Sequence, residues 1–397
     1  MTIKLATFKS SLRHSNDFNE QQHEFITAIE KQLNESFIFS SLEDYDCDLK
    51  LIFVQTGGAE GYFLEAMPKL CPPYYLLTNG SNNSLAASLE ILTFLKNHQL
   101  EGEIIHGDIS YIASRIKQLV LLEQAKKKLS NMRLGVIGKP SDWLIASTID
   151  FNAAHQLFGI EFVDIALKEL EGQALKPHFH SKKIEVSFDS KETSKALDIY
   201  EGLKEIVLKH HLNGLTLRCF DLLTSLKMTG CLALAYLNSE HIVSSCEGDM
   251  MALLSMCVIE AVSGKASFQA NPSRIDVQKN EVVLAHCTLP LNMALDYKLE
   301  THFESGIGVA VKGELKNEEV TIFRISADLK HYYLTTGRII QNLNDSHLCR
   351  TQIVVHLDND VKVLLNHPCG NHHIVCYGDE VANIERLMTS YGLIRVL

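Results

Sequence analysis

The first two thirds of the chain alternate between short β-type runs and longer helical patterns, and this order restricts the fold more than any other feature. The β-type runs are TIKLATF (residues 2–8), LKLIFVQT (49–56), YYLLT (74–78) and GEIIHG (102–107), and helical periodicity covers 20–33, 84–98 and 111–129. Strands that alternate with helices of this length predict a parallel sheet covered on both faces.

The same pattern starts again at MRLGVIGKPSDWLI (132–145), where a strand, a Gly/Pro turn and a helix opened by Ser141 or Asp142 are expected. From about residue 281 the chain holds β-rich runs without a long helix. We therefore predict two Rossmann-like parallel-sheet α/β domains, followed by a β-rich, barrel-like C-terminal domain. The expected bounds are 1–130, 131–265 and 266–397.

Composition narrows the function classes. A net charge of −11 argues against a nucleic-acid backbone as partner. The longest apolar stretch, near residues 250–262, is too short to cross a bilayer, and no signal peptide is recognised at the N-terminus. Ten scattered cysteines without a CxxC pair are typical of free thiols in a reducing compartment, so a cytoplasmic location is expected.

Two carboxylates stand where a predicted central strand ends and a Met-rich helix begins, in SSCEGDMMALLSM (244–256). Ligands collect outside the carboxyl ends of parallel strands, which favours Glu247 as a binding residue. Negative charge also stabilises a helix N-terminus, and Asp249 fits that second interpretation better. Both interpretations remain open at this point.

Three other motifs give weaker evidence of a binding site. HPCGNHHIVC (367–376) has spacings suited to half of a zinc site, but no second cluster matches it. NPSRID (271–276) is typical of a loop. GVIGKPS lacks the spacing of a phosphate-binding loop, and no G-x-G-x-x-G follows the first strand, so nucleotide sites are disfavoured.

Seven segments in a fixed order resemble the L-fucose isomerase and L-arabinose isomerase superfamily, in its shorter fucose-isomerase-like branch. They are GGAEG (57–61), GVIGKPSDWLI (135–145), TLRCFDLL (216–223), SSCEGDMMALL (244–254), VVLAHCTLP (282–290), GIGVAVKG (306–313) and GNHHIVCYGD (370–379). The resemblance implies a divalent-metal-dependent aldose–ketose isomerase that works through a cis-enediol. It also implies Mn²⁺ or a similar ion, and a homo-oligomer, a trimer or hexamer, with sites near subunit boundaries.

The resemblance further implies a metal held by two acids and a histidine. Glu247 matches the first acid, which is expected both to ligate the metal and to transfer the proton, and either His372 or His373 matches the histidine. Asn271 stands where the second acid is expected. An amide oxygen can ligate a metal but cannot accept a proton at neutral pH. Asp276 or Asp249 can supply the missing carboxylate, the chemistry can use one acid and water, or the protein binds a sugar without isomerising it.

Five further residues are candidates for contact with the substrate. Arg218 follows a predicted strand and can bind substrate or pair with a neighbouring acid. Trp143, the only tryptophan, can stack on a sugar or belong to the core. His286, Gly57 and Gly58 are the remaining candidates for contact with a small sugar substrate.

Overall fold

The computed structural model describes residues 1–11, 16–176, 178–184 and 186–397. The chain divides into two compact units, Met1–Gln124 and Ala125–Leu397, and the division falls inside helix α4 (Ile109–Ser130). The second and third predicted domains share one compact unit, so the predicted boundary near residue 265 stays a prediction.

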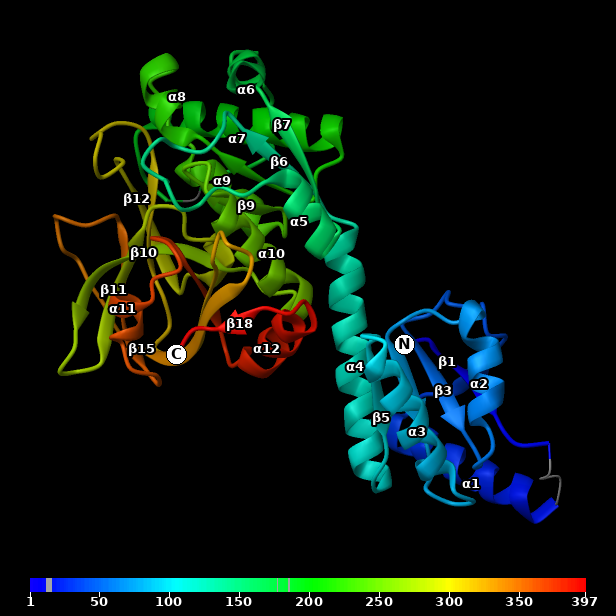
Figure 1. Ribbon diagram of the computed structural model, residues 1–397. Coiled ribbons are helices and arrows are strands. Elements are labelled where there is room, and N and C mark those ends of the chain that lie inside the picture. The colour runs from blue at the N-terminus through cyan, green and yellow to red at the C-terminus, as the bar shows by residue number, and fades with distance from the viewer. Residues whose placement is uncertain (12–15, 177, 185) are drawn as a thin grey trace. The chain divides into compact units, whose positions relative to one another are not determined.

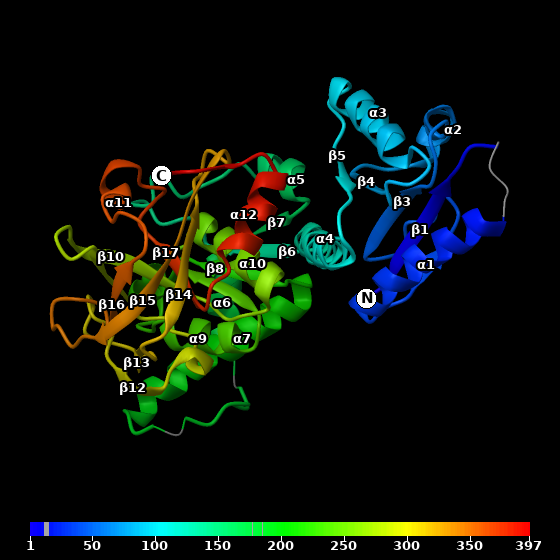
Figure 2. The same cartoon turned by 90° about the horizontal axis from the view of Figure 1, so that it is seen from below.

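The first unit is a five-stranded parallel sheet with helices on both faces (Figure 2). On one face Phe53 stacks on Phe25 of α1, and Tyr75 donates to Glu123 of α4; on the other face Phe63 of α2 belongs to the core. In sheet order the strands are β2 (Phe37–Phe39), β1 (Ile3–Phe8), β3 (Leu49–Val54), β4 (Tyr74–Leu77) and β5 (Gly102–Ile105), and the other helices are α1 (Asn16–Leu33), α2 (Glu60–Ala66), a 3₁₀ turn η1 (Met67–Lys69) and α3 (Ser84–Asn97).

The second unit begins with a four-stranded parallel sheet, in the order β7 (Glu161–Ile165), β6 (Arg133–Ile137), β8 (Gly214–Leu217) and β9 (Val243–Cys246). Its helices are α5 (Phe151–Phe158), α6 (Leu167–Ala174), α7 (Ser190–His210), α8 (Cys219–Ser225), α9 (Cys231–Ser239) and α10 (Met250–Ser263). Parallel strands with helical crossovers of this kind agree with the predicted α/β architecture.

The rest of the second unit is a closed antiparallel barrel of six strands, because β15 pairs with β14 as well as with β16. Around the barrel the strands are β14 (Glu319–Ile325), β17 (His373–Tyr377), β10 (Phe268–Asp276), β11 (Glu281–His286), β16 (Thr351–Leu357) and β15 (His331–Asn342). Outside it lie β12 (Asp296–Glu300), β13 (Ala310–Glu314), β18 (Ile394–Arg395), α11 (Val363–Asn366), α12 (Val381–Ser390) and the turn η2 (Leu291–Met293). The predicted fold class is confirmed.

Helix α10 joins the two layers of the second unit (Figure 1). It contacts β8 and β9 of the parallel sheet and β14 and β17 of the barrel. Every residue from Met250 to Glu260 is buried, which explains why its sequence is apolar all round. The helix thereby fixes the end of β9 against the barrel.

Three local predictions are wrong. No helix begins at Ser141 or Asp142; the chain makes turns there, and α5 begins at Phe151 with Asp150 as its N-cap. NPSRID is not a loop but the second half of β10, and the pairing with β11 shifts between Pro272 and Arg274, where a bulge tolerates proline. Strand β9 is an edge strand rather than a central one.

The structure bears on two of the predictions made from composition, the state of the cysteines and the absence of a membrane-spanning helix. All ten cysteines are free thiols. Within the ranges that the structure describes, no helix combines the length and apolarity needed to span a bilayer.

Candidate metal centre

The two carboxylates after β9 are separated by a tight turn that only glycine can complete. Glu247 and Gly248 both have positive φ angles, of 65° and 71°. A Cβ at position 248 would lie 2.5 Å from the carbonyl oxygen of Lys139. The loop after β6 therefore packs directly on this turn, and Ser141 N donates to the carbonyl oxygen of Glu247 at 3.0 Å.

The edge of β9 is closed by the barrel. The side-chain amide of Gln269, on β10, accepts from Cys246 N at 2.7 Å and donates to Cys246 O at 3.4 Å. This pairing takes the place of a further strand. As a result, Glu247 emerges at the junction between the parallel sheet and the barrel.

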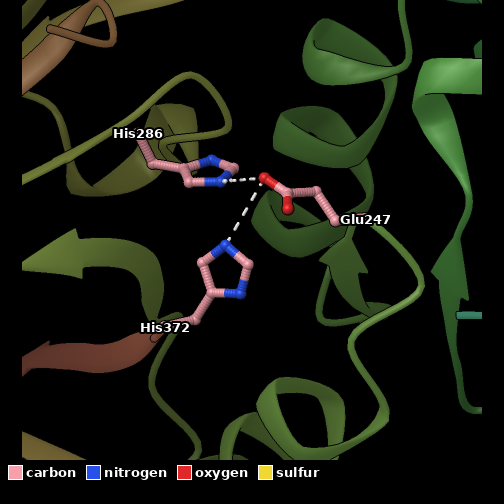
Figure 3. Close-up of side chains that lie close together, drawn as sticks. All are labelled: Glu247, His286 and His372. Atoms are coloured by element: carbon pink, nitrogen blue, oxygen red, sulfur yellow. Dashed lines mark ion pairs between the residues drawn. The ribbon is translucent and has the colours of Figure 1, made fainter. Parts of the chain in front are cut away.

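Two histidines from the barrel meet Glu247 at this junction (Figure 3). His286 is the last residue of β11, and His372 immediately precedes β17. The Nε2 atom of each ring lies 3.5 Å from Glu247 Oε1, and the two ring centroids are 5.3 Å apart. One ligand atom from each of the three residues lies within 4.8 Å of the others, and all three residues are buried.

The chemistry of this group fits a divalent cation. His372 Nε2 is buried and has no hydrogen-bond partner, although its other ring nitrogen, Nδ1, is held at 2.7 Å by Asp249. A buried polar atom without a partner is costly, and a bound cation would satisfy it. One carboxylate and two imidazoles, each oriented by a further hydrogen bond, are typical ligands of a catalytic transition-metal site.

A buried network orients His372. Asp249 caps α10 by accepting from Ala252 N at 2.7 Å, and its Oδ2 also accepts from His372 Nδ1 and from Arg324 at 3.1 Å. Arg324, on β14, is fully buried and also donates to Ser147 and to the carbonyl oxygen of Cys369. Asp249 therefore caps the helix, as its sequence position indicated, and it also orients His372.

The position of the Arg324 guanidinium also explains why residue 370, close to His372, is a glycine. A Cβ at Gly370 would lie 2.8 Å from the Nη2 atom of Arg324, and Gly370 has a φ of 127°, which side chains rarely adopt. The segment that leads to His372 therefore needs glycine at 370 so that Arg324 can reach the carbonyl oxygen of Cys369.

Burial and the neighbouring ionisable groups shift the pKa values of all three residues in the cluster. Burial raises the pKa of Glu247, but the adjacent imidazole groups of His286 and His372 outweigh burial and leave the pKa well below its usual range. Burial lowers the pKa of His372, whereas Asp249 and Glu247 raise it, with a net result of about 9. Burial and the charge of His372 lower the pKa of His286 despite the opposing effect of Glu247.

A pH dependence of metal binding follows from these shifts. At pH 7 His372 carries a proton on the nitrogen that faces Glu247, and a cation must displace that proton. We expect the apparent affinity for Mn²⁺ to rise by about tenfold per pH unit from pH 7 and to level off near pH 9. Calorimetric titration in buffers of different ionisation enthalpy counts the proton released. An affinity that is flat between pH 7 and 9 would exclude His372 as the proton donor.

His373 is held differently from its neighbour. Successive residues of an extended segment point to opposite sides. The ring of His373 packs edge-on against Tyr333 at 5.2 Å, and its Nδ1 lies 3.3 Å from the carbonyl oxygen of Asn371. Burial and the charge of Arg324 lower the pKa of His373 to about 3. Among the described histidines, cysteines and acids, His372 belongs to the three-residue cluster and His373 does not.

The residues considered as the second acid lie in different surroundings. Asn271 is on β10 opposite Ala285 of β11, and its Oδ1 accepts from Asn371 at 3.4 Å. Asp276 is five residues further along β10, roughly 17 Å away at the rise of a strand, and it caps the following turn. Asp249 is already bonded to His372 and Arg324. That Asn271 and His373 ligate the metal stays a prediction.

The structure also places the other residues that were predicted to bind substrate. Arg218 pairs with Asp142 at 3.0 Å and Asp221 at 2.9 Å, so the ion pair considered for it is present. Trp143 is not a core residue, because 52% of it is exposed, and its Nε1–H donates to Glu247 Oε2 at 2.8 Å. Gly57 and Gly58 follow β3 in the first unit, and their role in binding sugar stays a prediction.

Sequence reasoning missed three features of this site. It took His286 as a substrate contact, whereas the structure places it in the cluster with Glu247. It did not single out Arg324, whose only signal is a charged residue inside the apolar run TIFRIS. It also passed over Glu304, whose pKa is raised by partial burial and by the negative charge of Glu247.

Comparisons with known proteins find relatives that share one name. No family model matches the chain. Curated relatives named sulfoquinovose isomerase match at low identity. The one from Alkalicoccus urumqiensis is 23% identical over 270 residues, which cover 64% of this chain and 61% of that protein. The one from Priestia megaterium is 24% identical over 262 residues, which cover 62% of this chain and 59% of that protein. A relative of the same name from a Clostridium species is 24% identical over 277 residues, covering 64% and 61%. The chain thus spans about three fifths of the length of these relatives.

Proposed function

We propose that the protein is a divalent-metal-dependent aldose–ketose sugar isomerase of the fucose and arabinose isomerase type. The observation that carries this proposal is the buried Glu247, His286 and His372 cluster, in which one ligand atom from each residue lies within 4.8 Å of the others. Low-identity relatives that share the name of a sugar isomerase support the same class. Mn²⁺ is the proposed ion, because the family resemblance implies it and a carboxylate such as that of Glu247 is a ligand that suits it.

The proposed reaction moves a carbonyl between two adjacent carbons of the sugar through a cis-enediol. A divalent cation bound here would withdraw electron density from two adjacent oxygens of the substrate. Glu247 presents one oxygen to the cation site and stays ionised across the working pH range. His372 is kept in one tautomer by Asp249, with its Nδ1–H donated to the carboxylate.

Proton transfer between the two carbons needs a base within reach of the substrate. Asn271 cannot serve, since an amide does not accept a proton at neutral pH. Glu304 is the proposed alternative, because partial burial and the negative charge of Glu247 raise the pKa of its carboxyl group, as a proton acceptor near the site requires. Arg218 is the proposed contact for substrate hydroxyls or for a negatively charged substituent.

The direct test is conversion of sugars by the purified protein with added Mn²⁺. The panel contains sulfoquinovose, which is included because of the relatives' name, together with glucose, fucose and arabinose. Conversion to a ketose, with deuterium from D₂O retained at the carbon that receives the proton, is the expected result. A label at another carbon would indicate an epimerase or lyase instead.

A second candidate function is sugar binding without isomerisation, and Asn271 favours it because no carboxylate stands at that position. This candidate predicts that a sugar raises the unfolding temperature while no product forms. Thermal unfolding with the same panel therefore separates the two functions in one set of samples. The homo-oligomer, trimer or hexamer, stays a prediction that light scattering can test.

A further inference from the structure

Trp143 combines an exposed ring with a hydrogen bond to a buried carboxylate. It is the only tryptophan of the chain, and it lies in the turns after β6, where a helix was expected. Its ring is 52% exposed, yet its Nε1–H reaches Glu247 Oε2 at 2.8 Å, and Glu247 is only 9% exposed. An exposed aromatic side chain is thus connected directly to a residue of the candidate metal centre.

The backbone around Trp143 is fixed relative to Glu247. Ser141 N donates to the carbonyl oxygen of Glu247, and Gly248 lies against the carbonyl of Lys139. Arg218 donates to the carbonyl oxygen of Pro140. The same turn that carries the carboxylate therefore also positions the loop that carries the indole.

The ring of Trp143 is held as well. It packs edge-on against Phe220 of α8 with centroids 5.0 Å apart, and Phe220 packs edge-on against His302 at 5.4 Å. His302 lies in the segment between β12 and β13 and is 8% exposed. Rotating the indole away from Glu247 would break this aromatic contact, so the N–H is directed at the carboxylate before any ligand binds.

The two oxygens of Glu247 therefore have separate partners. Oε1 faces the Nε2 atoms of His286 and His372, both at 3.5 Å, and Oε2 accepts from Trp143. We propose that Trp143 is a positioning residue, which occupies Oε2 and leaves Oε1 as the single oxygen of Glu247 that ligates a cation. This inference rests on the proposed metal site, and it concerns the N–H group rather than stacking of the ring on a sugar.

The inference predicts that removing the N–H weakens cation binding without unfolding the protein. Trp143→Phe keeps an aromatic ring and loses the donor. A carboxylate that is free to rotate loses its fixed orientation, and loss of such a hydrogen bond typically weakens a metal site by about 10–100-fold. We expect the Kd for Mn²⁺, read from the electron paramagnetic resonance signal of free Mn²⁺, to rise at least about tenfold.

A second replacement separates the N–H from the shape of the ring. Because the chain has one tryptophan, biosynthetic substitution by benzothienylalanine changes only position 143 and exchanges the N–H for sulfur. The same loss of Mn²⁺ affinity is expected. The unfolding midpoint without metal should stay unchanged in both forms, since the residue is half exposed.

The matched control is Tyr75→Phe. It also removes an aromatic donor from a glutamate, Glu123 at 2.7 Å, but in the first unit. Its Kd for Mn²⁺ should equal that of the wild type. Unchanged affinity in Trp143→Phe and in the benzothienylalanine form would overturn the inference and leave the metal site standing. Absence of Mn²⁺ binding by the wild type would overturn both.

Discussion

Replacing Glu247 by glutamine should lower kcat by at least about 10³-fold on any sugar that the wild-type protein isomerises, equivalent to about 4 kcal/mol of transition-state stabilisation. The amide keeps the shape of the side chain and can still accept the hydrogen bond from Trp143. It removes the negative charge that offsets a cation between the two imidazoles. The measurement is the rate of ketose formation at saturating Mn²⁺.

A matched acid elsewhere in the second unit controls for folding. Glu260 is also 9% exposed and is bonded to Lys128, so Glu260→Gln makes the same chemical change in a similarly buried position. Its kcat should remain close to that of the wild type. Full activity of Glu247→Gln on such a sugar would show that the assigned roles are wrong.

A large loss of stability is expected when Arg324 is replaced. Replacing it by methionine leaves Asp249 buried and without its guanidinium partner, and both side chains are fully inaccessible to solvent. Breaking a buried ion pair from one side costs about 3–5 kcal/mol. We expect the midpoint of thermal unfolding of the second unit to fall by roughly 10 °C.

Two further variants identify the cause of that loss. The double variant Arg324→Met with Asp249→Asn should recover part of the lost stability, because no unpaired charge remains buried. Arg274→Met removes an exposed ion pair with Asp345 and should change the free energy of unfolding by less than about 1 kcal/mol. An Arg324→Met variant as stable as Arg274→Met would contradict the account of this network.

The architecture could be predicted because each layer leaves a periodic pattern. Runs such as TIKLATF and LKLIFVQT alternate with helical patterns, and both became elements of the first unit. The Met-rich segment after Asp249 was recognised as a helix, and its burial between sheet and barrel explains its composition. Local patterns failed at 141–150, where Ser141 and Asp142 look like N-caps but lie in a segment of turns.

The site could be predicted only in part, since its geometry depends on contacts between distant segments. Glu247 stood out because it follows a strand. His286 did not stand out as a partner of Glu247, because nothing local in VVLAHC shows that its ring lies 5.3 Å from that of His372, on the far side of the intervening strand β10. His372 and His373 are equivalent in sequence, and only the packing of Tyr333 and the bond from Asp249 distinguish them.

The account depends most on the claim that Glu247, His286 and His372 hold one divalent cation. Mn²⁺ is paramagnetic and quenches a nearby indole, and Trp143, the only tryptophan, donates to Glu247 at 2.8 Å. Titration with Mn²⁺ should quench the intrinsic fluorescence saturably, with one ion per chain. The quenching should disappear in His372→Ala and persist in His373→Ala. Quenching that survives in His372→Ala, or no saturable quenching in the wild type, would contradict the proposed centre.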